Sequence, residues 1–92
     1  MSVDFRALPG GEYVVEGIRD LEDGRVSASA LLVSIGAPRL RRCGISLPNP
    51  LIAPEKRLYA LLQREYGDGA HSRYNALIRR LVSFERSVES AS

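Results

Sequence analysis

The sequence predicts a compact all-α domain, and three observations support this fold class. Apolar residues recur at helical spacing in four segments, and no segment alternates apolar and polar residues over the length of a strand. Glycines and prolines fall between these segments, where they are expected to break helices. The chain has 92 residues, of which 45% are hydrophobic and 26% charged, as is typical of a globular domain with one core. We therefore expect one helical domain over residues 1–92, a bundle of four main helices plus one short helical turn.

The first main helix is expected over residues 12–23, and Gly24 is well suited to end it. Residues 1–10 show little periodicity, so they are expected to form a loop or a flexible arm. The apolar face of the helix consists of Val14, Ile18 and Leu21. Gly17 lies at the edge of this face. It either permits a close helix crossing or is an imperfection that the helix tolerates.

The second helix is expected over residues 28–35, because Ser27 is a good N-cap and Gly36 a natural break. The short helical turn follows over residues 37–43, with Pro38 suited to its first turn. The spacing of this helix–glycine–helix pattern matches a DNA-binding helix-turn-helix poorly. Its second helix is too short to bury an apolar residue and still present a polar face.

Residues 44–54 are expected to form an extended strap across the bundle. They contain three prolines, which disfavours a helix or a central strand. Their apolar residues argue against a solvated linker: Ile45, Leu47, Leu51 and Ile52. The third main helix is expected to begin at Pro54 and to end before the Gly67-Asp68-Gly69 break.

The last helix, over residues 70–90, has the clearest period in the chain. At ~100° per residue, its apolar side chains fall within an arc of roughly 160°. These residues are Leu77, Ile78, Leu81, Val82, Phe84 and Val88, counted from Tyr74. Arginines line both margins, Arg79 and Arg86 on one side and Arg73 and Arg80 on the other. The pattern predicts a helix that faces the core and has a charged rim.

Two glutamates interrupt apolar faces. Glu85 projects into the arc of the last helix, and Glu65 into the face of the preceding one. A carboxylate within an apolar face is costly unless it is paired or reaches water. Each therefore either extends to solvent at its helix end or pairs with an arginine of another helix. A glutamate buried against an arginine would be the best functional candidate in the chain.

Charge is unevenly distributed, although the net charge is only +2. Residues 1–24 hold six acidic residues and two arginines, whereas residues 25–45 hold four arginines and no acid. This pattern fits an acidic first helix packed beside a basic neighbour. It also allows a phosphate-binding patch if the arginines converge in the fold. The candidate binding residues are Arg39, Arg41, Arg42, Arg79 and Arg80.

A small-ligand or enzymatic site would have to form around His71, Tyr74 and Glu85. His71 is the only histidine and lies at the edge of the last helix's apolar arc. Cys43 is the only cysteine, and nothing in the sequence brings it to that histidine. No catalytic motif, metal-ligand cluster or cofactor fingerprint is present, so no metal and no cofactor are expected.

The single cysteine excludes an intramolecular disulfide, and no cationic and apolar leader is apparent. The expected location is therefore cytoplasmic. No apolar run is long enough for a membrane span, so no membrane partner is expected.

Three hypotheses for function remain. The first is a non-catalytic protein–protein interaction or adaptor module, including a small homodimer, that uses the last helix and its arginine rim. The second is a nucleic-acid or phosphate-binding protein that acts through the arginine patch. The third is a small-ligand or enzymatic site around the histidine. The first is favoured because a wide apolar arc occurs without any catalytic signature.

Overall fold

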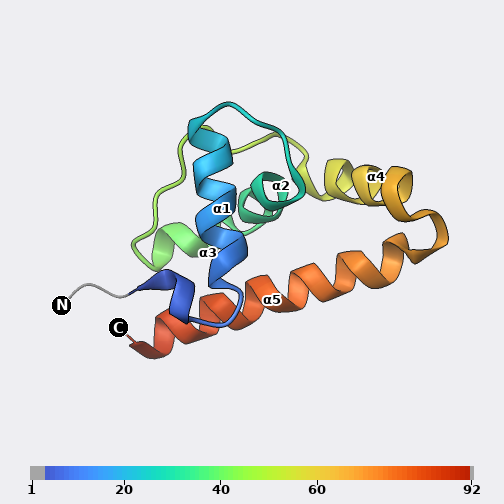
Figure 1. Ribbon diagram of the computed structural model, residues 1–92. Coiled ribbons are helices and arrows are strands. Elements are labelled where there is room, and N and C mark those ends of the chain that lie inside the picture. Colours follow the sequence, from blue (N-terminus) through green and yellow to red (C-terminus); the bar gives the residue numbers. More distant parts are fainter. Residues whose placement is uncertain (1–3, 92) are drawn as a thin grey trace.

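The computed structural model describes residues 4–91 and confirms the all-α bundle (Figure 1). Its main helices are α1 (Gly11–Glu22), α2 (Ala28–Ile35), α4 (Pro54–Tyr66) and α5 (Ala70–Ala91). The expected short turn is α3 (Ala37–Arg42), and two 3-10 turns complete the fold, η1 (Phe5–Ala7) and η2 (Gly67–Gly69). No strand occurs within residues 4–91.

The short helix α2 forms the centre of the bundle, and α1, α4 and α5 all pack against it. Six consecutive residues of α2, Ser29 to Ser34, are buried. A helix that is apolar on all sides is stable only when neighbours surround it. The remaining core comes mainly from one face of each surrounding helix, with Phe84 of α5 as its largest fully buried side chain.

Gly17 is where α1 crosses α2. A Cβ atom at this position would collide with the backbone oxygen of Ser29 and would lie 2.8 Å from Cγ1 of Val33. Two backbones can approach this closely only where one residue has no side chain. Of the two interpretations that the sequence leaves open for Gly17, the structure therefore supports the close helix crossing.

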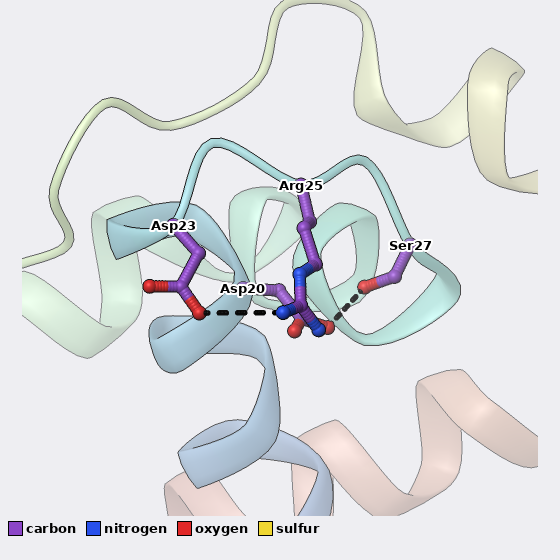
Figure 2. A network of polar contacts seen from close by, with 4 residues as sticks. All are labelled: Asp20, Asp23, Arg25 and Ser27. Carbon is purple, nitrogen blue, oxygen red and sulfur yellow. Dashed lines mark hydrogen bonds and ion pairs between the residues drawn. The ribbon is translucent and has the colours of Figure 1, made fainter.

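The connection between α1 and α2 is held by a short polar network (Figure 2). The hydroxyl of Ser27 donates a hydrogen bond to Oδ2 of Asp20 over 2.6 Å. The Oγ atom of Ser27 also accepts a hydrogen bond from the backbone N–H of Ala30 over 3.0 Å, which confirms Ser27 as the N-cap of α2. Asp23 and Arg25 form an exposed ion pair at 3.9 Å beside this network. Ser27 thus caps one helix while it holds a buried carboxylate of the other.

The proline-containing strap crosses between α3 and α4 without regular structure, as expected. It is attached to the core through Ser34, whose hydroxyl donates to the carbonyl of Ala30 and accepts from the N–H of Leu51. Ile45 is buried and Leu51 is half-buried. Ile52 departs from the expectation, because it is 84% exposed. Only some of the apolar residues of the strap therefore anchor it to the core.

The described part of the expected N-terminal loop or arm packs on the bundle. Asp4 caps the 3-10 turn η1, and the ring of Phe5 meets that of Phe84 edge-on, with centroids 5.8 Å apart. Phe5 and Leu8 both pack against the core, but two apolar residues are too few to produce a periodic signal in the sequence. Residues 1–3 of the expected arm lie outside the described residues.

The helices α4 and α5 form an antiparallel pair that extends beyond the other helices (Figure 1). As a result the molecule is elongated, with extents of 43 × 25 × 19 Å. We call the end of this pair, around η2, the tip. Within the described residues, no helix combines the length and the hydropathy that crossing a membrane requires.

Candidate functional site: one face of α5

One face of α5 lines two hollows in the surface. Four residues spaced at i, i+4, i+7 and i+11 share this face: His71, Asn75, Ile78 and Val82. The half toward the tip lines a hollow against α4, and the other half lines a hollow against α3 and the end of α2. Glu85 follows His71 by 14 helical steps, so the face between them is about 21 Å long.

The first hollow, which we call the aromatic hollow, has a volume of about 460 Å³ and opens between α4 and α5. Its floor is Tyr59, whose ring meets those of Tyr74 and His71 edge-on at centroid distances of 5.7 and 6.5 Å. The side-chain amide of Asn75 donates to Nε2 of His71 over 3.2 Å. Burial, and then the nearby Glu55 carboxylate, raise the pKa of the Tyr74 hydroxyl. Because these three rings pack against one another, the apolar surface of the hollow has a defined shape.

The second hollow, which we call the carboxylate hollow, has a volume of about 380 Å³. Its walls are mainly apolar, formed by Ile35, Pro38, Ile78, Leu81 and Val82. Gly36, at the junction of α2 and α3, packs closely over its polar group, where there is no room for a side chain. A Cβ atom there would lie 2.9 Å from Cδ1 of Leu81 and 3.3 Å from Oε2 of Glu85.

Glu85 is the polar group of this hollow, and it is only 3% exposed. Its Oε1 lies 3.9 Å from Nη1 of Arg39, an ion pair too long for a hydrogen bond. Its Oε2 is buried and has no hydrogen-bond partner among the described residues. Burial raises the pKa of the Glu85 carboxyl, Arg39 lowers it, and Glu89 raises it again. A buried carboxylate with an unused acceptor is unusual in a folded protein.

The two glutamates found within apolar faces have different environments. Glu65 is exposed and lies near the end of α4, at the tip. Glu85 is covered by the α2–α3 junction and meets Arg39. The buried pair anticipated for one of these residues is therefore present at Glu85, at a distance that leaves its oxygens poorly satisfied.

The structure does not bring the three pocket candidates to one point. His71 and Tyr74 line the aromatic hollow, whereas Glu85 lies in the carboxylate hollow, more than three helical turns further along α5. The sequence placed all three on one face, and they do share it. Separation along the helix axis prevents them from acting on one small molecule.

The five arginines proposed for a phosphate patch also have different surroundings. Arg39 pairs with Glu85, and the guanidinium of Arg80 lies 5.4 Å from the ring centroid of Tyr13. The other three, Arg41, Arg42 and Arg79, are exposed. Two of the five therefore have protein partners of their own.

The remaining chemical candidate, Cys43, is half-buried at the end of α3. Burial, and then the carboxylates of Glu89 and Glu85, raise the pKa of its thiol. The thiolate is therefore disfavoured, and the thiol is a weak nucleophile. No group of three metal-ligating side chains is found in the described part of the chain.

We expect Glu85→Met to stabilise the protein at neutral pH. Methionine keeps the shape of the side chain and removes the unpaired buried acceptor, whose cost is about 1–3 kcal/mol. Arg39 loses a partner at little cost, because its side chain is 67% exposed. Urea unfolding at pH 7 followed by circular dichroism would measure the difference in the free energy of unfolding.

The stabilisation by Glu85→Met should decrease in acid. The folded state raises the pKa of Glu85 above its unfolded value, so the folded protein binds this proton more tightly. The cost of the carboxylate is then fully present above the folded-state pKa and disappears as the pH falls below the unfolded value of about 4.3. An equal gain at pH 7 and in acid would contradict this account.

No protein-family model matches this chain, and no match is found among curated proteins or solved structures.

Proposed function

We propose that this protein is a non-catalytic interaction module, and that the face of α5 between His71 and Glu85 binds an amphipathic helix of a partner protein. The observation that supports the proposal is the pair of mainly apolar hollows along one helix face. A helix presents apolar side chains at the same i, i+3, i+4 and i+7 spacing as this face. About four turns of a partner helix match its length.

The aromatic hollow is the expected centre of the binding energy. Tyrosines in a pre-formed apolar hollow offer a large contact area and lose little conformational freedom on binding. Tyr59 and Tyr74 already hold each other in the unbound protein. An aliphatic residue of the partner helix would fill the space between α4 and α5.

The charge around the face indicates an acidic partner. Lys56 borders it on α4 and Arg39 on α3, and Arg79 and Arg86 lie beside it on α5. Acidic residues border it mainly at its two ends, Glu55 and Glu89. A partner helix with carboxylates flanking its apolar residues complements this rim, whereas a basic helix would be repelled.

Titration calorimetry with two designed helical peptides tests the proposal. Both peptides carry a leucine face, with glutamates on its margins in one and lysines in the other. We expect the glutamate peptide to bind more tightly and to weaken with salt. We expect Tyr59→Ala to weaken it by at least about tenfold, as for a residue at the centre of an interface.

Tyr13→Ala is the matched control, because Tyr13 is a half-buried tyrosine of α1 outside the face. This variant should bind the glutamate peptide as the unchanged protein does. Absence of binding, or equal binding of the lysine peptide, would overturn the proposal. Sedimentation that shows a dimer, broken by Tyr59→Ala, would assign the face to a second copy of the chain instead.

A further inference from the structure

The carboxylate hollow has a feature that the binding of an apolar helix does not use. Its apolar walls surround a carboxylate that the protein itself does not satisfy. A deprotonated Oε2 needs a donor, and no donor to it is present among the described residues. The carboxylate therefore has an unmet hydrogen-bonding need.

The local charge favours a cation over a neutral donor. Burial, and then the carboxylates of Glu89 and Glu85, raise the pKa of the neighbouring Cys43 thiol, so negative charge adds to the effect of burial beside the hollow. Arg39 offsets part of it, but at 3.9 Å and with a largely exposed side chain it does not complete a hydrogen bond. An ion inside the hollow would be less screened by water than this guanidinium.

The shape of the hollow adds a second requirement. Ile78 and Val82 form its walls along α5, and Pro38 faces them from α3. An aliphatic segment fits between such walls, while its charged end reaches the carboxylate. Gly36 packs too closely on Leu81 and on Oε2 of Glu85 to leave room for a side chain, so a charged group would reach the carboxylate at Oε1, beside Arg39.

We propose that the carboxylate hollow binds an alkylammonium or alkylguanidinium group, with Glu85 as the acceptor of its hydrogen bonds. Such a group occurs in free aliphatic amines and at the end of lysine and arginine side chains. The inference does not depend on the helix-binding proposal, since a free amine needs no partner protein. Arg39 acts as a competitor that the ligand must displace from the carboxylate.

The test uses n-butylammonium as the probe and follows backbone amide shifts by NMR. We expect saturable shifts around Gly36, Arg39 and Glu85, and no comparable response to n-butanol or butyrate. Glu85→Gln should weaken binding by at least about tenfold, because the charge is lost at constant shape. Arg39→Ala should tighten it, because the competing cation is removed.

Glu65→Gln is the matched control, since Glu65 is an exposed carboxylate near the end of α4. It should leave binding unchanged. Equal binding of n-butanol, an unchanged affinity in Glu85→Gln, or absence of saturation by n-butylammonium would each overturn the proposal. The effect of Tyr59→Ala on peptide binding arises at the aromatic hollow and does not bear on these outcomes.

A second arm of the experiment separates the two sources of the group. A short blocked peptide with one central lysine is compared with the same peptide containing norleucine. Tighter binding of the lysine peptide than of n-butylammonium assigns the hollow to a protein side chain. Binding of n-butylammonium with exclusion of the peptide assigns it to a free amine.

Discussion

Phe84→Ala is expected to lower the free energy of unfolding by about 3–5 kcal/mol, the range for truncation of a buried aromatic residue. Phe84 is fully buried, and it also holds Phe5, whose ring contacts it edge-on. The change therefore leaves a cavity in the core and releases the N-terminal turn η1. Thermal and urea unfolding followed by circular dichroism would measure the loss.

A loss of this size is a large fraction of the stability of a domain of 92 residues, for which about 5–14 kcal/mol is typical. Phe84→Leu serves as the milder variant if the alanine variant does not fold, and it should give a smaller loss of the same sign. Ser83→Ala is the control on the exposed side of the same helix, with an expected change within about 0.5 kcal/mol. Similar stabilities for the Phe84 and Ser83 variants would contradict the described core.

Gly17→Ala is expected to destabilise the protein by about 1–3 kcal/mol, the usual cost of overpacking. The new methyl group would collide with the backbone oxygen of Ser29, which cannot move as a side chain can. The helix α1 would have to move away from α2 and expose part of the core around Val14. In an uncrowded helix the same change would stabilise by roughly 1 kcal/mol, so the sign of the effect is diagnostic.

Gly69→Ala is the control for the intrinsic effect of the substitution. The nearest atom to a Cβ at Gly69 is Cβ of Tyr66 at 3.7 Å, an ordinary contact. We expect a change within about 0.5 kcal/mol for this variant in the same urea titration. A Gly17→Ala protein as stable as the unchanged one would mean that the glycine is only tolerated by α1.

The candidate site was partly readable from the sequence. The angular position of Glu85 already placed a carboxylate in the apolar face of the last helix, together with Tyr74 and His71 at its edge. Tyr59 was not singled out as a site residue, because it reads as one more apolar position of α4. Tyr59 on α4 faces His71 and Tyr74 on α5. Aromatic residues on both helices of a predicted helical hairpin were the signal in the sequence that could have identified it.

The sequence by itself determined the fold class, the helix boundaries and the cap at Ser27, because these depend on residues close together in the chain. It also determined which side chains share a face of α5. Only the tertiary structure decided that Glu85 is buried and Glu65 exposed, since burial depends on which helix covers each position. It likewise separated His71 from Glu85 and assigned Arg39 and Arg80 to different partners. Angular periodicity describes one helix, whereas a site also requires the distances between helices that pack together.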